Sequence, residues 1–449
     1  HGVPRDHARL GHCLLASPPE ALPEALPLHD EYSGLTITAD ARIDNREELQ
    51  DKLFRPTTAG EVITDSQLIL AAYRKWNEAC VEHLLGDFAF AIWDQRADAL
   101  FVARDPMGCK PFYYHCRNGL FVFASSATAI ARVPAVKATL NEGRVADYRV
   151  HELEGINKTC TWYKEISRMP PAQCGYFRDH CFRYRQYWLL QPADLSHLKT
   201  DEDYLGTFTE VYTEAVRCRL RCNTGPASML SGGLDSSTIV ALARDILVAD
   251  DAPPLGTFSA VSEAGADCAE TRSVEAVINS GGLRAKLLRP ADVAHRAKPL
   301  AAAIARMEDP FDCECTLLAL MYLNAAMAGA RTMLTGLDCE HAVGATSNYI
   351  SRIIGGGSWT EAWRESKGFS RHYYRGALSP PVIFFRALRS SLTPELLRST
   401  KRKLATHRRY RQLVAPAALP AGLARRVDLP GRLVEYELGR CAMSNAAIR

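Results

Sequence analysis

Short apolar and aromatic runs, broken by Gly, Pro and Asp, fill much of the first half of the chain. Runs of this kind are typical of an antiparallel sheet with tight turns. The segment 34–45 begins with strand-like alternation and ends in a polar turn, whereas Asp65–Trp76 has helical spacing with Asp or Ser as its cap. The pattern therefore predicts sheets with few helices between them. The apolar runs are Phe88–Trp93, Ala99–Ala103, Pro111–Tyr114 and Leu120–Ala124.

Strand and helix patterns alternate in the second half of the chain. This alternation predicts a parallel sheet covered by helices on both faces, with ligands at the carboxyl ends of its strands. The loops 231–237, 259–263 and 336–341 lie at such ends. The predicted strands are Pro226–Leu230, Leu255–Val261, Leu283–Leu288 and Arg331–Thr335. The predicted helices are Asp203–Leu220, Thr238–Arg244, Glu270–Asn279, Pro299–Met307, with Pro at its first position, and Thr316–Ala328.

Length and composition indicate a globular protein of more than one domain. The chain has 449 residues, of which 47% are hydrophobic and 23% charged, and one domain usually takes roughly 100–200 residues. We expect a fold class of α/β plus α+β, with domains at 1–188 and 203–449 joined by a polar linker at 189–202. A net charge of +3 gives no argument for nucleic acid as a partner.

The fourteen cysteines are scattered, and their spacing matches no zinc site. Many lie in apolar surroundings, as Cys80, Cys174 and Cys339 do, which favours reduced thiols packed as small hydrophobic groups. No apolar run reaches the length of a membrane span, and the first ten residues do not read as a signal peptide. We therefore expect a cytoplasmic protein without a membrane partner.

The stretch Leu230-Ser231-Gly232-Gly233-Leu234-Asp235-Ser236-Ser237 joins a predicted strand to a predicted helix. Unpaired N–H groups and the helix dipole favour an anion at such a place, and the glycines allow the backbone to approach it closely. The serines add hydroxyl donors, and Asp235 offers an oxygen ligand for Mg²⁺. This is not the phosphate loop that ends in Gly-Lys-Ser/Thr, because no Lys follows the glycines. The pattern resembles the pyrophosphate-binding loop of ATP pyrophosphatases, which implies ATP and Mg²⁺ as ligands.

Two segments of the first half resemble the glutamine-hydrolysing domain of asparagine synthetases. They are 85–94, which includes Gly86-Asp87-Phe88-Ala89-Phe90, and 103–114, which includes Arg104-Asp105-Pro106. Together with the loop at 231–237, the resemblance covers residues from about 20 to 340. It implies an N-terminal Ntn-hydrolase-like sheet sandwich followed by a parallel-sheet synthetase domain of the ATP pyrophosphatase type.

The first domain departs from the resembled family at its reactive positions. That family needs an N-terminal Cys followed by Gly, whereas here Cys13 is followed by Leu14 within the chain. The family's Asn-Gly-Glu segment, which supplies oxyanion donors, reads Asp40-Ala41-Arg42. A carboxylate would repel an oxyanion formed there. We therefore expect an inactive glutaminase-like domain, so that no ammonia is made from glutamine.

Other candidate site residues follow from the resemblance. Gly336 comes after the strand that ends at Thr335, and Glu340 or Asp338 is the implied partner of Asp235 at the metal; capping of the next helix is the alternative. Phe258 and Ser259 are expected to flank adenine through backbone contacts at the end of the second strand, although core packing is the alternative for Phe258. The resemblance also places Glu308 in the active site, where it would orient the amine or the acyl-adenylate, against the alternative of a helix-terminal or surface acid.

The chemistry implied is ATP-dependent amide formation with Asp235, Glu308 and Glu340 as catalytic residues. Among relatives with an inactive glutaminase domain, the chain resembles lasso peptide cyclases (macrolactam synthetases) best, through the segment 39–45 and the start Gly11-His12…Pro18-Pro19-Glu20. The resemblance implies a precursor peptide whose Asp or Glu side chain is adenylated and closed onto its own N-terminal amine. It also implies a leader peptidase and a leader-binding protein as partners. The alternatives are a beta-lactam or carbapenam type synthetase, which Leu337 disfavours because those enzymes have Tyr there, an ammonia-dependent asparagine synthetase, and a non-catalytic scaffold that binds nucleotide or peptide.

Overall fold

The structure is a computed structural model of the 449 residues. It describes residues 2–4, 8–54, 62–150, 153, 157–191, 193–265, 268–308, 316–337, 349–373, 376–392 and 419–436. The chain forms two compact units, the first of His1–Lys137 with Ile166–Glu340 and the second of Ala138–Glu165 with His341–Arg449. None of the described helices is long and apolar enough to cross a membrane.

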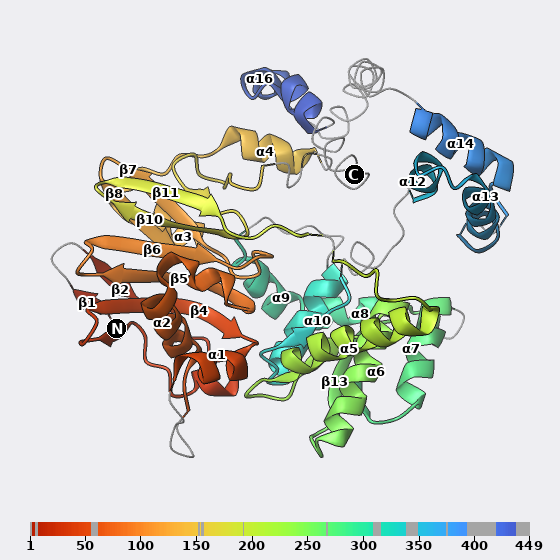
Figure 1. Ribbon diagram of the computed structural model, residues 1–449, viewed down its shortest axis with the longest axis horizontal. Helices are drawn as coiled ribbons and strands as arrows, with labels where there is room; N and C mark the ends of the chain where they lie inside the picture. The colour runs from red at the N-terminus through yellow and green to blue at the C-terminus, as the bar shows by residue number, and fades with distance from the viewer. Residues whose placement is uncertain are drawn as a thin grey trace. The chain divides into compact units, whose positions relative to one another are not determined.

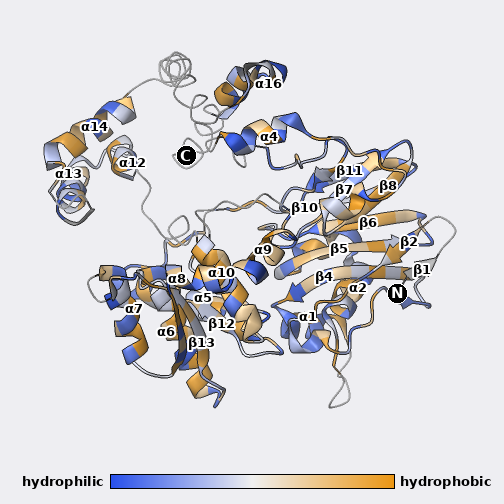
Figure 2. Cartoon of the chain, turned by 180° about the vertical axis from the view of Figure 1, so that it is seen from behind, coloured by the Kyte–Doolittle hydropathy of each residue, from blue (hydrophilic) through white to orange (hydrophobic). Residues whose placement is uncertain are grey.

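A six-stranded antiparallel sheet forms the N-terminal part of unit 1 (Figure 1). Its strands follow the order β11-β10-β6-β5-β4-β3, and its central strands are almost fully apolar (Figure 2). Phe88, Phe90 and Phe101 are completely or almost completely buried there, and helix α2 packs on the same side through Leu68 and Ile69. The strands are β3 (Leu28–Asp30), β4 (Leu35–Ile43), β5 (Gly86–Asp94), β6 (Ala99–Arg104), β10 (Gln173–Arg178) and β11 (Cys181–Gln186).

A three-stranded sheet, in the order β8-β7-β9, packs against the other face of this sheet. Stacked rings join the two layers, as where Phe121 lies 5.1 Å from Phe177, centroid to centroid. The strands are β7 (Tyr113–Arg117), β8 (Leu120–Ala124) and β9 (Ser167–Arg168), and a separate pair is β1 (Gly2–Pro4) with β2 (Arg9–Gly11). The helices are α1 (Arg46–Leu53), α2 (Asp65–Trp76) and α3 (Ala127–Ala131), with the 3-10 turns Pro19–Ala21 and Asn77–Glu82. Sheet on sheet is the layering that the sequence predicts.

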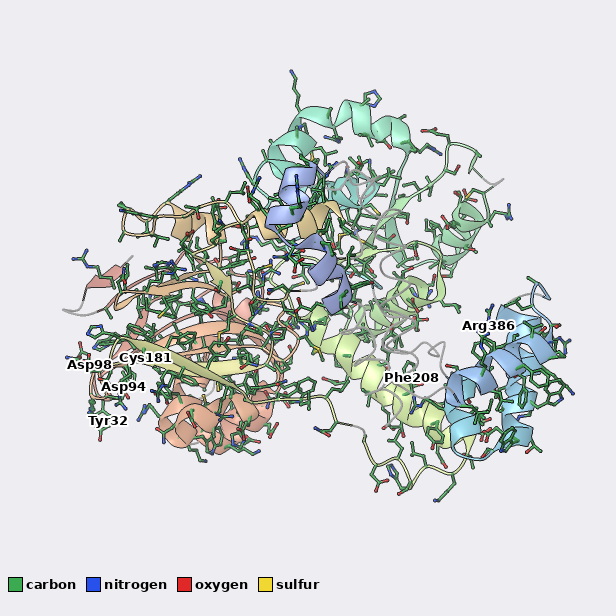
Figure 3. The ribbon with its side chains drawn as sticks, turned by 90° about the horizontal axis from the view of Figure 1, so that it is seen from above. Tyr32, Asp94, Asp98, Cys181, Phe208 and Arg386 are labelled. Atoms are coloured by element: carbon green, nitrogen blue, oxygen red, sulfur yellow. The ribbon has the colours of Figure 1, made fainter. Side chains whose placement is uncertain are left out.

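At one rim of the six-stranded sheet, side chains form hydrogen bonds to the backbone of its turns. The Asp94 carboxylate accepts the N–H groups of Arg96 and Ala97 at 2.9 and 3.0 Å, which fixes the turn between β5 and β6. The Arg96 guanidinium then donates to the carbonyl of Tyr32 at 2.7 Å. Tyr32, Asp94, Asp98 and Cys181 gather at this rim, far from Phe208 of helix α5 (Figure 3).

A four-stranded parallel sheet, in the order β14-β13-β12-β15, forms the rest of unit 1. One face packs on α5 and α6 through residues such as Val216, Val240 and Leu255, and the other packs on α10 through Phe258 and Ala325. The strands are β12 (Ala227–Met229), β13 (Leu255–Ala260), β14 (Leu283–Leu288) and β15 (Met333–Leu334). The helices are α5 (Asp201–Leu220), α6 (Leu234–Ala249), α7 (Ala269–Asn279), α8 (Pro290–His295), α9 (Ala297–Ile304) and α10 (Thr316–Met327).

Unit 2 is helical where it is described. Helices α12 (Tyr349–Gly355), α13 (Trp359–Gly368) and α14 (Pro380–Leu392) share a core that includes Ile350, Ala362 and Ile383, and a π-helical turn covers Phe369–Tyr373. Helix α4 (Glu142–Arg149) packs with α16 (Ala421–Arg426). The buried carboxylate of Asp147 holds the Arg432 guanidinium at 2.8 Å, so the two segments are joined by an ion pair as well as by apolar contacts.

Local details differ from the sequence-based expectations. The cap of α2 is Thr64, not Asp65 or Ser66, because the Thr64 hydroxyl accepts the Gln67 N–H while the Gln67 side chain accepts the Thr64 N–H. Pro299 does not open α9, which already begins at Ala297, although Pro290 does open α8. The strand expected over Arg331–Thr335 is confined to Met333–Leu334.

The described cysteines are all free, including Cys80 and Cys174 in the core. Burial raises the pKa of both thiols, to about 11 for Cys174. Their packing as small apolar groups agrees with the expectation of reduced thiols, whereas Cys339 lies outside the described residues.

Candidate functional site

The loop at 230–237 lies between β12 and α6, at the carboxyl end of the parallel sheet. Gly233 is the N-cap of α6 and provides no side-chain cap. The N–H groups of the first helical turn, on Leu234, Asp235 and Ser236, consequently have no intrahelical acceptor. They form the positive end of a sixteen-residue helix, and the half-buried Asp235 lies in its first turn. This geometry is suited to binding phosphate oxygens.

Two serines hold the loop in shape. The Ser231 N–H donates to Ser236 Oγ at 3.1 Å, and the two hydroxyl oxygens lie 2.9 Å apart. Ser236 is buried and Ser231 exposed. Both hydroxyls were predicted as donors to a bound anion, but here their hydrogen bonds close the loop on itself. These hydrogen bonds fix the shape of the loop.

The third serine is different, because Ser237 Oγ is buried without a hydrogen-bond partner. A buried hydroxyl without a partner costs free energy, roughly 1–3 kcal/mol by mutational data. Ser237 follows directly on the three unpaired N–H groups of the first turn. The Ser237 hydroxyl and these amides are therefore donors of the loop that have no acceptor within the described protein.

Close backbone approaches demand glycine at two positions of the site. Gly232 has a φ of 78°, and a Cβ there would lie 2.8 Å from Ser273 Cβ on α7. A Cβ on Gly336 would lie 2.9 Å from the Ser236 nitrogen and 3.1 Å from Asp235 Cβ. The loops after β12 and β15 therefore touch beside Asp235, as the sequence predicts for loops at neighbouring strand ends.

Asp235 is the one predicted metal ligand among the described residues. Asp235 could offer one carboxylate to Mg²⁺, whereas its predicted partners Asp338 and Glu340 lie outside the described residues.

Elsewhere in the described chain, Asp87, Asp105 and Cys109 come close enough to share an ion. Those carboxylates already accept hydrogen bonds, at Asp105 from the N–H groups of Met107, Cys109 and Lys110 and at Asp87 from Arg219. This cluster is therefore a network of internal bonds.

The neighbouring strand contributes backbone and core to the site. The Phe258 carbonyl accepts the Leu230 N–H at 3.1 Å, and the Phe258 side chain is buried against Ala227 and Ala325. Core packing thus describes the ring of Phe258, and the Leu230 side chain is buried in the core on the opposite face. Ser259 is 1% exposed, and its hydroxyl has no partner. Contact of either residue with adenine stays a prediction.

Glu308 contacts the N-terminal region of unit 1. Its carboxylate accepts hydrogen bonds from the Ser126 hydroxyl and from Thr128 Oγ1, the latter at 3.3 Å, at the start of α3. A carboxylate at the N-terminus of a helix is a stable arrangement without substrate. Its predicted role toward the amine or acyl-adenylate is not visible in these contacts and stays a prediction.

Asp40 and Arg42, in the segment predicted to stand in place of the oxyanion donors, both form ion pairs. Asp40 Oδ1 lies 2.6 Å from Lys110 Nζ. Arg42 donates to Asp44 at 2.9 Å and to the carbonyl of Arg221 at 3.3 Å. Cys13 is exposed within the chain. Asp40 and Arg42 thus fill this place with side chains that are already bound, and sequence reasoning did not foresee their partners Lys110 and Arg221, which are distant in the chain.

Two family models match the chain, one after the other. Residues 3–188 match the glutamine amidotransferase domain family, and residues 207–422 match the asparagine synthase family. The predicted boundaries at 188 and 203 concern the complete domains and stay a prediction, since the compact units divide the chain differently.

Curated relatives are similar to this chain over about half of its length. The glutamine-hydrolysing asparagine synthetase 3 of Bacillus subtilis is 32% identical over 239 residues, which are 52% of this chain and 38% of the relative. A putative glutamine-hydrolysing asparagine synthetase 2 of Methanocaldococcus jannaschii is 29% identical over 56% of this chain and 47% of its own. Amidase chyE of Penicillium rubens is 27% identical over 53% of this chain and 35% of its own length. The chain thus spans less than half of the length of these relatives, and it is similar to asparagine synthetases through two matched domains in this order.

Proposed function

We propose that the chain is an ATP-dependent macrolactam synthetase, which joins a side-chain carboxylate of a precursor peptide to that peptide's own N-terminal amine. The observation that carries the ATP-dependent step is the loop after β12. There, the free N–H groups of the first α6 turn, the unpartnered Ser237 hydroxyl and the close approach of Gly336 come together beside Asp235. This donor set supports cleavage of ATP between its α- and β-phosphates.

In the first step, an oxygen of the peptide carboxylate attacks the α-phosphorus of ATP. A bond forms between that oxygen and the α-phosphorus, the α–β phosphoanhydride bond breaks, and pyrophosphate leaves. The N–H groups of Leu234, Asp235 and Ser236 and the Ser237 hydroxyl would stabilise the charge of the leaving pyrophosphate. Asp235 would hold Mg²⁺, which when bound neutralises further charge on the phosphates.

In the second step, the amine attacks the acyl carbon, AMP leaves, and the amine loses its proton to water. The amine of a peptide N-terminus ordinarily has a pKa of about 7.7–8.0, so an appreciable fraction is neutral near pH 7. A strong general base is then less necessary, in agreement with Leu337, which has no proton to transfer. The ion pairs of Asp40 and Arg42 support an amine that comes from the substrate, because ammonia from glutamine would need oxyanion donors there.

An asparagine synthetase is the second candidate, and the similarity to the Bacillus subtilis enzyme favours it. The two candidate functions differ in their substrates. An asparagine synthetase would release pyrophosphate when given aspartate and ammonia, in the absence of any peptide. For the macrolactam reaction, a leader peptidase and a leader-binding protein would supply the free N-terminal amine. Neither candidate requires the first domain to hydrolyse glutamine.

The test is incubation of the full chain with ATP, Mg²⁺ and a candidate precursor peptide that bears a free amine. We expect pyrophosphate release together with a peptide product lighter by one water, detected by mass spectrometry. Asp235→Ala should abolish both products, whereas Asp245→Ala, an exposed position on the same helix, should keep them. Pyrophosphate release with aspartate and ammonia alone would replace this proposal with the second candidate.

A further inference from the structure

The last turn of α5 is tied to the six-stranded sheet by two arginines. Arg219 forms a bidentate pair with Asp87 on β5, with its Nη2 at 2.9 Å from Oδ1. Arg221, directly after α5, donates to the carbonyl of Ile43 on β4 at 2.6 Å and lies 3.4 Å from Glu20 and 3.5 Å from Asp44. Both contacts lie within unit 1 and join segments more than a hundred residues apart.

These charges are partly removed from water. The side chain of Asp44 is 7% exposed and that of Asp87 16%. Burial by itself would raise the pKa of Asp87, but hydrogen bonding and attraction from Arg219 lower it overall. The hydrogen bond to Asp87 in turn raises the pKa of Arg219. A pair of this kind costs more to break than an exposed one, because one buried charge would remain without its partner.

The chain that follows α5 also forms hydrogen bonds to the backbone at Ala16 and Ser17, in the N-terminal part of unit 1. The backbone N–H of Asn223 donates to the carbonyl of Ser17 at 2.8 Å, and its side-chain amide donates to the carbonyl of Ala16, also at 2.8 Å. Arg331 reaches the same Ala16 carbonyl at 3.3 Å. The Arg331 N–H also donates to Thr224 Oγ1 at 3.3 Å, so the two segments are joined to each other.

Both anchored segments lead directly into the candidate site. Asn223 precedes β12, which has three residues and ends at the loop 230–237. Arg331 precedes β15, which has two residues and ends before Gly336. The strands pair in parallel, with Ala227 opposite Met333, so their starting points determine where their ends lie. A displacement at the anchored ends would be carried to the Asp235–Gly336 contact over a few residues of rigid strand.

We propose that the glutaminase-like part of unit 1 serves as a brace for ATP binding, in which Arg219, Asn223 and Arg331 are positioning residues for the pyrophosphate loop. This rests on the proposed function, since the loop is taken to bind ATP. The brace assigns the N-terminal sheets a function that does not depend on glutamine hydrolysis. A group held away from its productive position by about 1 Å can cost a reaction up to roughly a hundredfold in rate.

The experiment compares ATP binding and turnover in Arg219→Ala and Arg331→Ala with the wild-type chain. Arg217→Ala is the matched control, because Arg217 lies on the same helix but is exposed, 3.8 Å from Glu214. Binding of a non-hydrolysable ATP analogue with Mg²⁺ is measured by calorimetry, and KM for ATP and kcat are measured by pyrophosphate release. Arg331→Ala removes only the exposed hydrogen bond to the Ala16 carbonyl, so we expect this variant to fold. It tests the brace even if Arg219→Ala does not fold.

We expect about tenfold weaker analogue binding and a matching rise in KM in both brace variants, with Arg217→Ala unchanged. A double variant that exchanges the pair, Arg219→Asp with Asp87→Arg, should recover part of the loss. Thermal midpoints that fall while analogue binding at low temperature stays at the wild-type value would overturn the brace. Failure of the wild-type chain to bind the analogue would instead reject the proposed function.

Discussion

At the scale of single residues, the thiols show how local surroundings set reactivity. The pKa of the Cys268 thiol is lowered, chiefly by the backbone N–H of Thr271 at the start of α7. Burial, together with the charges of Asp87 and Asp105, raises the pKa of Cys109 to about 12. The thiolate is the reactive form, so the two cysteines should differ in rate although Cys109 is the more exposed residue.

We expect iodoacetamide at neutral pH to alkylate Cys268 well before Cys109. Peptide mass spectrometry at short reaction times measures the order, and Cys80, fully buried with a raised pKa, serves as the unreactive reference. Equal rates at Cys268 and Cys109 would show that the helix start does not stabilise the thiolate.

At the scale of elements, the local sequence pattern predicts well that a helix or strand is present and which of the two it is. It predicts less well the residues at which each element begins and ends. Asp65–Trp76 is a helix with the predicted limits, because its apolar spacing and polar start are local properties. Its cap was mispredicted because Thr64 and Gln67 form a reciprocal pair that only the geometry shows. Thr335, expected in a strand, is outside β15, since only Met333 and Leu334 find partners, on β12.

The capping box of α2 makes a prediction about stability. Thr64→Ala removes the acceptor for the Gln67 N–H, and we expect a loss of about 1 kcal/mol in unfolding free energy. Urea unfolding followed by circular dichroism measures it. Thr238→Ala is the control, because the Thr238 hydroxyl is exposed and bonds only to a carbonyl within α6; a loss no larger for Thr64→Ala than for this control would contradict the cap.

At the scale of the whole molecule, the sequence could not reveal the contacts between distant segments. The loop 230–237 and its position after a strand were predictable, because strand, glycines and helix follow one another in the chain. The ion pairs of Arg219 and Arg221 were not predictable from the sequence. A charged residue on or next to a helix usually faces solvent, and the partners of these two arginines lie far away in sequence. The same holds for Arg46, which pairs with the buried carboxylate of Asp65.

The buried Asp65 predicts a pH dependence of stability. Burial raises its pKa to about 6, in spite of the attraction of Arg46. In the unfolded state the carboxyl has its ordinary pKa of 3.8. Between pH 3.8 and about pH 6 the folded state therefore keeps a proton on Asp65 that the unfolded state has released. Stability from this group increases as pH falls from 7 toward 4, and is lost as pH rises through 6.

Amide hydrogen exchange of Leu68, whose N–H donates to the carbonyl of Thr64 in the α2 turn that contains Asp65, measures this effect locally. Corrected for the intrinsic rates, we expect protection in the wild type to rise about tenfold from pH 7 to pH 5, which corresponds to about 1.4 kcal/mol. The Asp65→Asn variant, which cannot titrate, should show no such rise. An equal change in both proteins would place the titrating group elsewhere.

The function proposed for the whole chain requires the loop around Asp235 to cleave ATP to AMP and pyrophosphate for the activation of a carboxylate. Phosphorus NMR of the nucleotide products during turnover with the peptide substrate shows which phosphate bond is broken. We expect AMP and pyrophosphate in equal amounts, matched by the amide formed and lost in Asp235→Ala. ADP with inorganic phosphate would contradict this chemistry, because the α–β bond would then remain intact.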